Sequence, residues 1–93
     1  MSSKPRIAIH YCPRCHWLLR SAWLAQELLT TFADDLAEVA LKPAETSGTF
    51  IITLDDHVIW ERVQDGGFPE AKVLKQRVRD HIDPDRTLGH IDR

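Results

Sequence analysis

The apolar positions of this chain follow two different periods, and these periods separate predicted strands from predicted helices. A short and nearly continuous apolar run at residues 7–11 predicts a mostly buried strand. After residue 17 the apolar residues recur at spacings of three and four, which predicts a helix that ends near residue 33. The apolar stripe of this helix contains Leu18, Ala22, Ala25, Leu29 and Phe32.

Three more strands are predicted in the middle of the chain, at residues 36–41, 49–54 and 58–63. They either alternate apolar with polar residues or are rich in β-branched and aromatic residues. Residues 42–48 contain Pro, Ser and Gly and are expected to form a loop. Residues 55–57 predict a hairpin between the last two strands, although they lack the Asn-Gly or Asp-Gly pair of the strongest hairpin signals.

A second helix is predicted near the end of the chain. It follows a turn at residues 64–69, where two successive glycines allow backbone angles closed to other residues. Pro84 ends it, and residues from about 84 to 93 are expected to form a polar tail. The apolar stripe comprises Ala71, Leu74, Val78 and Ile82, and the basic residues Lys72, Lys75, Arg77 and Arg79 are expected to form a solvated face.

The predicted elements follow the order β-α-β-β-β-α. A β-α-β unit places its two strands in parallel through a right-handed crossover, whereas a hairpin is antiparallel. We therefore expect a single α/β domain over residues 1–93, with a four-stranded mixed sheet and two helices packed on it. This is the minimal thioredoxin-like arrangement.

Composition narrows the possible functions. Of the 93 residues, 43% are hydrophobic and 28% are charged, which excludes collagen-like and disordered chains. The formal net charge of −2 offers no basic field to nucleic acid or to an anionic membrane. The longest apolar-rich region, residues 17–29, is interrupted by polar residues and is too short to span a membrane. We expect no targeting segment and a cytoplasmic location.

Cys12 and Cys15 form a Cys-x-x-Cys motif where the first predicted strand meets the first predicted helix. The free N–H groups of a helix N-terminus and the charge of Arg14 favour a thiolate over a thiol. Pro13 suits the first helical turn, because its missing N–H has no intrahelical partner there. The motif therefore predicts thiol–disulfide chemistry, in which one cysteine attacks a disulfide and the other resolves the mixed disulfide.

The same residues leave other interpretations open. Cys12-x-x-Cys15-His16 matches the attachment motif of c-type haem, although that attachment normally needs an export signal. A zinc ion held by His10, Cys12, Cys15 and His16 would need two adjacent helical residues that project about 100° apart. The plainest alternative is that both cysteines are small buried hydrophobic residues. We expect no cofactor and no metal at the motif.

Further motifs accompany the cysteines over nearly the whole chain, from Arg6 to His90. They are Tyr11-Cys12-x-x-Cys15, Ala22-Trp23-Leu24-Ala25-Gln26-Glu27-Leu28, Gly48-Thr49-Phe50, Trp60-x-Arg62, Gly66-Gly67-Phe68-Pro69-Glu70, Leu74-Lys75-Gln76-Arg77-Val78-Arg79-Asp80, and Asp83-Pro84 with Leu88-Gly89-His90. With them the chain resembles the Cys-containing bacterial members of the selenoprotein W/T/H family, also called the Rdx family. The Cys-x-x-Cys motif alone is weak evidence, but its combination with Gly-Gly-Phe-Pro is specific.

The resemblance implies a thioredoxin-like fold and a thiol-based redox role. It matches Cys15 to the position of selenocysteine in the animal selenoproteins, which implies attack by Cys15. Thioredoxin logic instead assigns attack to Cys12, as the more exposed cysteine. We expect Cys12 to attack and Cys15 to resolve. Typical thioredoxins also place a cis-proline opposite the site, and because residues 45–48 contain no proline, substrate docking is expected to differ.

The expected function is that of a thiol–disulfide redox protein acting on protein or small-molecule disulfides. Its expected electron donor is glutathione or thioredoxin. The hypothesis from another class is a redox-gated interaction module, in which the disulfide changes the surface around Trp17, Phe68 or Trp23 and so alters partner binding. Turnover separates the two, because an enzyme reduces many disulfides per molecule whereas a module oxidises once.

Overall fold

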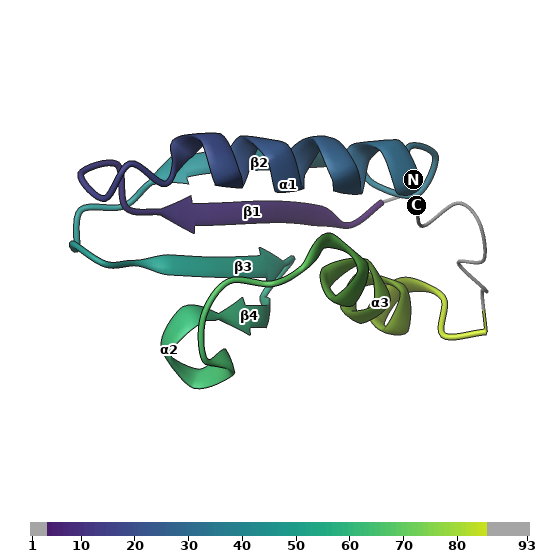
Figure 1. Ribbon diagram of the computed structural model, residues 1–93. Helices are drawn as coiled ribbons and strands as arrows, with labels where there is room; N and C mark the ends of the chain where they lie inside the picture. Colours follow the sequence, from purple (N-terminus) through teal and green to yellow (C-terminus); the bar gives the residue numbers. More distant parts are fainter. Residues whose placement is uncertain (1–3, 86–93) are drawn as a thin grey trace.

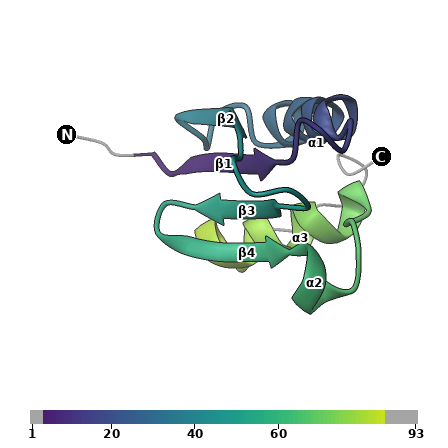
Figure 2. The ribbon, with the colours of Figure 1, turned by 90° about the vertical axis from the view of Figure 1, so that its left-hand side faces the viewer.

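The computed structural model describes residues 4–85. These residues form a four-stranded sheet with two long helices on one of its faces (Figure 1). Both helices lie on the same face, because they contact each other as well as the sheet (Figure 2). The elements are β1 (Arg6–Tyr11), α1 (Leu18–Thr31), β2 (Glu38–Pro43), β3 (Phe50–Leu54), β4 (His57–Glu61), α2 (Arg62–Asp65) and α3 (Ala71–Ile82).

The strand order is β2-β1-β3-β4. β1 runs parallel to β2, with Ile7 opposite Val39, because α1 carries the chain back over the sheet. β1 is antiparallel to β3, and β3 is antiparallel to β4 through the turn at Asp55 and Asp56. The predicted mixed sheet, crossover and hairpin are confirmed, and the fold is thioredoxin-like.

The core lies between the sheet and the two long helices. Alternate side chains of β1 and β3 point to the helix side and are buried, as the period of two requires. The main contributors are Ile7, Ile9, Tyr11, Phe50, Ile52 and Leu54 from the strands, Leu24, Leu28 and Phe32 from the α1 segment, and Leu74 and Val78 from α3. The buried stripe predicted for the second long helix is confirmed at its centre.

The buried face of α1 differs from the predicted stripe. Leu18 and Leu29 are 46% and 42% exposed, so the predicted stripe is wrong at these two positions, whereas Ala25 and Phe32 are buried as predicted. The buried residues are Ser21, Leu24, Ala25, Leu28 and Thr31. Ser21 can be buried because its hydroxyl donates a hydrogen bond to the Trp17 carbonyl, at 2.7 Å. A prediction of the buried helix face from hydrophobicity alone leaves out a polar residue such as Ser21.

The strand predicted at residues 58–63 ends at Glu61, and a short helix, α2, takes its place. The Glu61 carboxylate accepts a hydrogen bond from the Gln64 backbone N–H, while the Asp65 carboxylate accepts one from the Glu61 N–H. These reciprocal bonds satisfy the first turn of a helix, which the apolar alternation does not reveal. Residues 4–85 therefore contain one helix more than the two that were predicted.

The solvated face predicted for the basic residues of α3 is confirmed at Lys72, which is exposed, and is wrong at Lys75 and Arg77. Lys75 is 2% exposed, and its ammonium group lies 2.9 Å from a carboxylate oxygen of Glu27 on α1. Arg77 is half-buried and makes an ion pair with Asp65. A buried charge is tolerated where a partner of opposite sign meets it, so α3 is attached to its neighbours partly through charged groups.

Two further predictions concern a membrane-spanning segment and the polar tail. Within residues 4–85, no helix is long and apolar enough to cross a membrane. Of the polar tail predicted from about residue 84, only Pro84 and Asp85 belong to the described part, and both are exposed. Residues 86–93, with the Leu88-Gly89-His90 motif, lie outside the described residues.

Candidate functional site

The two cysteines lie in the loop between β1 and α1, at one end of the sheet (Figure 1). Residues 13–16 form a turn, in which the His16 N–H donates to the Pro13 carbonyl at 3.1 Å. His16 has a φ of 63°, a left-handed conformation that cannot continue a helix. α1 therefore begins at Leu18, and the prediction that Pro13 lies in its first turn is wrong.

The structure pairs Cys12 and Cys15 in a disulfide, with Cα atoms 5.4 Å apart. Cys12 is only 1% exposed, whereas Cys15 is partly exposed. The expectation that Cys12 is the more accessible cysteine is therefore wrong. Cys12 directly follows the central strand β1, which carries it into the molecule, and Cys15 lies in the exposed turn between Arg14 and His16.

A loop between β2 and β3, residues 44–49, lies against the buried cysteine. The Ser47 hydroxyl is 3.9 Å from the Cys12 sulfur. The Ala44 N–H donates to the Tyr11 carbonyl at 2.8 Å, so this loop is joined to the residue that precedes Cys12. Ser47 was not predicted as a site residue, although the thioredoxin comparison had placed residues 45–48 opposite the site; the Cys-x-x-Cys motif itself carries no signal from a segment 35 residues away.

An aromatic cluster with two arginines supports the cysteine loop. The Trp17 and Phe68 rings meet edge to face with centroids 4.8 Å apart, and the Phe50 and Phe68 rings do so at 4.9 Å. The guanidinium group of Arg20 lies 3.9 Å from the Phe68 ring centroid, and that of Arg62 lies 5.1 Å from the Trp17 ring. Phe68, from the Gly-Gly-Phe-Pro segment, thus links Trp17, the residue just before α1, to Phe50 at the start of β3.

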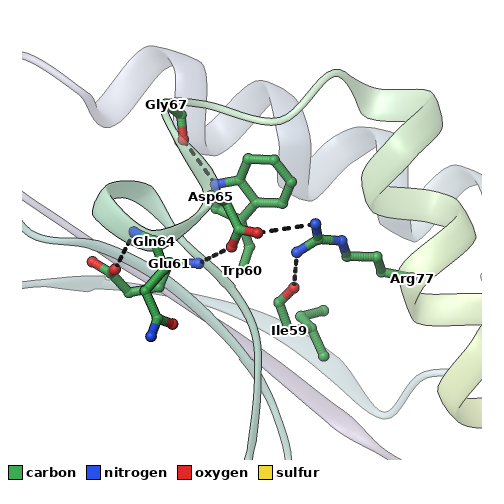
Figure 3. A network of polar contacts seen from close by, with 7 residues as sticks. All are labelled: Ile59, Trp60, Glu61, Gln64, Asp65, Gly67 and Arg77. Carbon is green, nitrogen blue, oxygen red and sulfur yellow. Dashed lines mark hydrogen bonds and ion pairs between the residues drawn. The ribbon is translucent and has the colours of Figure 1, made fainter.

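Figure 3 shows the polar network that holds the Gly-Gly-Phe-Pro segment in place. Arg77 of α3 contacts the Asp65 carboxylate at 3.0 Å and donates to the Ile59 carbonyl at 2.9 Å. Its guanidinium group also lies 4.4 Å from the Trp60 ring centroid. The Trp60 indole N–H donates to the Gly67 carbonyl at 2.9 Å. The segment that carries Phe68 is therefore fixed to both α3 and β4.

The ion pair of Asp65 predicts a pH dependence of stability. The hydrogen bond from Arg77, followed by the Glu61 backbone N–H, holds the pKa of Asp65 below its ordinary value of 3.8. This stabilisation is present above pH 3.8 and is lost as the pH falls towards the lower folded-state pKa. Urea unfolding across this window should show a steeper acid loss of unfolding free energy for the wild type than for Asp65→Asn. Equal acid sensitivity would contradict the assignment.

The residues considered for zinc are not gathered around one point. Among residues 4–85, no group of three or more His, Cys, Asp or Glu side chains is placed to hold a metal ion. His10 lines a depression on the open face of the sheet together with Lys42 and Thr53. Burial, and then the charge of Lys42, lower the pKa of His10, so its environment favours the neutral imidazole.

Comparisons with known proteins agree on one family. The model of the Rdx family matches residues 6–80. A crystal structure of a protein from Bordetella parapertussis is 64% identical, with a TM-score of 0.82, and the match covers 85% of this chain and 99% of that one. A crystal structure of a selenoprotein W-related protein from Vibrio cholerae is 60% identical, with a TM-score of 0.84, covering 87% of this chain and 100% of that one. No curated protein matches this chain.

Proposed function

The chain belongs to the Rdx family, and on this premise we propose that it is a thiol–disulfide redox protein. Cys12 and Cys15 cycle between a dithiol and a disulfide. The observation that carries the proposal is the geometry of the pair, in which one sulfur is accessible and the other is buried within bonding reach of it. The similarity to a selenoprotein W-related protein supports a redox-type role.

The difference in exposure supports Cys15 as the attacking residue. A disulfide substrate must approach along the axis of its own S–S bond, and Cys12 is too deeply buried to meet it. The Cys15 thiolate attacks one substrate sulfur, forms a mixed disulfide and releases the other half of the substrate as a thiolate, which takes up a proton. The Cys12 thiolate then attacks the Cys15 sulfur and releases the second half. These roles are the reverse of those expected from thioredoxin logic.

The proposed substrates are protein or small-molecule disulfides. Exposed apolar side chains lie directly after the cysteine loop, with Leu18 and Leu19 exposed by 46% and 81%. Arg14 and Arg20 add positive charge on the same stretch. A thiol donor must reduce Cys12–Cys15 to complete the cycle, and glutathione or thioredoxin has the required chemistry. We place this cycle in the cytoplasm, where the thiol pool can reduce such a disulfide.

The experiment that tests the proposal is intact mass spectrometry after thiol trapping, across a dithiothreitol redox series. We expect a reversible loss of two hydrogens per chain, with Cys12 and Cys15 protected from the trap only in the oxidised form. The same protein, supplied with a regenerating donor, should reduce a model disulfide through many turnovers. Two thiols that never pair, or a stoichiometric metal ion or haem, would refute the proposal.

The second candidate, a redox-gated interaction module, is supported by the contact between the cysteine loop and the aromatic cluster. Trp17 is two residues from Cys15 and packs on Phe68, so breaking the disulfide can alter a surface that includes the 52% exposed Trp23. Single oxidation without turnover, together with a change in partner affinity, would favour this candidate over the enzyme.

A further inference from the structure

We propose that Ser47 is a catalytic residue, whose hydroxyl donates a hydrogen bond to the Cys12 sulfur whenever that sulfur carries negative charge. The inference deepens the proposed function and rests on it. The Ser47 Oγ and the Cys12 Sγ are 3.9 Å apart, which is within reach of a weak hydrogen bond to sulfur.

The need for such a donor follows from the burial of Cys12. With 1% of its surface exposed, its sulfur cannot be solvated by bulk water. A buried anion without a donor is costly, and a hydrogen bond to a charged group is worth more than one between neutral groups. The chemistry nevertheless requires Cys12 to become a thiolate, so a donor from the protein lowers the energy of that state.

The donor acts in both directions of the cycle. When Cys12 resolves the mixed disulfide, its thiol first loses a proton to solvent, and its thiolate then bonds to the Cys15 sulfur and expels the substrate thiolate. When an external thiolate reduces the protein, it bonds to the Cys15 sulfur and the bond to Cys12 breaks, so Cys12 departs as the thiolate. In the resolving step the Ser47 hydroxyl raises the fraction of Cys12 that is present as the attacking thiolate. In the reduction of the protein it stabilises Cys12 as the leaving thiolate, and a leaving thiol with a lower pKa departs faster.

The loop around Ser47 is held so that the hydroxyl is already placed before any charge forms. The Thr49 hydroxyl donates to the Thr46 carbonyl at 2.8 Å, across the tip of the loop. Arg62 donates to the Gly48 carbonyl at 3.3 Å, which ties the loop to α2. Gly48 has a φ of 82°, which glycine adopts without strain and other residues do not. A donor fixed in advance costs no reorganisation during the reaction.

Release of chromophore from dithiobis(nitrobenzoate) tests the role, because each step of the cycle frees one coloured thiolate. Attack by Cys15 releases the first, and resolution by Cys12 releases the second. In Ser47→Ala we expect the first phase to keep its rate and the second to slow roughly tenfold, a factor equivalent to about 1.4 kcal/mol. The pH midpoint of the second phase should rise by about one unit.

Two variants make the result specific. Ser47→Thr keeps a hydroxyl and should retain the wild-type second phase, and Thr46→Ala, in the same loop, should leave both phases unchanged. If Ser47→Ala keeps the second-phase rate and pH midpoint of the wild type, or slows both phases equally, Ser47 has no such role. If the wild type itself never forms the internal disulfide while releasing chromophore, the proposed function fails, and this inference fails with it.

Discussion

Replacing Cys15 with serine should lower the rate of model-disulfide reduction by at least about a thousandfold, because the accessible sulfur is lost and a neutral hydroxyl is a poor nucleophile at neutral pH. The buried Cys12, 1% exposed, cannot take over the attack. The steady-state rate with a regenerating donor, measured beside the wild type, checks this expectation.

Cys12→Ser is the matched control, because it removes the other sulfur of the same pair. We expect this variant to keep the first step and then to accumulate a mixed disulfide through Cys15, visible as an added half-substrate mass on the intact chain. The reverse pattern, with a trapped mixed disulfide in Cys15→Ser and no attack in Cys12→Ser, would show that Cys12 is the nucleophile. The exposure argument would then be wrong.

Replacing Phe50 with alanine should destabilise the protein by about 4 kcal/mol, a large part of the ~5–15 kcal/mol of a typical domain. Phe50 is fully buried, so the truncation leaves a cavity that the surrounding core fills only in part. Its ring also packs against Phe68 with centroids 4.9 Å apart, so the support of the cysteine loop is weakened as well. Urea unfolding of the oxidised protein measures the loss.

Phe68→Ala is the control for this prediction. Phe68 is only partly buried, so its truncation should cost about 2 kcal/mol, less than that of Phe50. Phe50→Leu should recover most of the loss, because it restores much of the removed volume. A larger loss of unfolding free energy for Phe68→Ala than for Phe50→Ala would contradict the prediction. It would mean that contacts of the partly buried Phe68 ring stabilise the protein more than burial of Phe50 in the core.

If the cysteine variants and the phenylalanine variants behave as expected, the residues of the site have separate roles. Cys15 attacks the substrate and Cys12 resolves the mixed disulfide. The aromatic and arginine contacts hold the cysteine loop against the Gly-Gly-Phe-Pro segment. Mutation of Phe50 would then change stability separately from chemistry, because its buried side chain has no group that reacts.

Local features of the sequence determined much of the fold. The local sequence encodes the backbone in several places: the apolar run of β1, the β-branched and aromatic residues of β3, the spacing of Leu74 and Val78, and the two glycines before Phe68. The cysteine motif was identified in the same way, because its two members are close in sequence. Short-range stereochemistry suffices for features of this kind.

For polar and charged residues on the helices, only the tertiary structure decided whether the side chain is buried or exposed. Lys75 is predicted on the surface, but it is buried against Glu27, which is 48 residues away and supplies the opposite charge. Ser21 is absent from the predicted stripe of α1, yet it is buried because its hydroxyl donates to the Trp17 carbonyl. In both cases burial depends on a polar partner whose position the apolar period does not contain.

The same limit applied to the site. The sequence determined that two cysteines can form a disulfide, but the relative exposure of Cys12 and Cys15 depends on the turn at His16 and on the loop that carries Ser47. The exposed fraction of an atom depends on what packs against it, and the Cys12 sulfur contacts the hydroxyl of Ser47, 35 residues later in the chain. Spacing therefore identified the reacting pair, and long-range packing decided which sulfur faces the substrate.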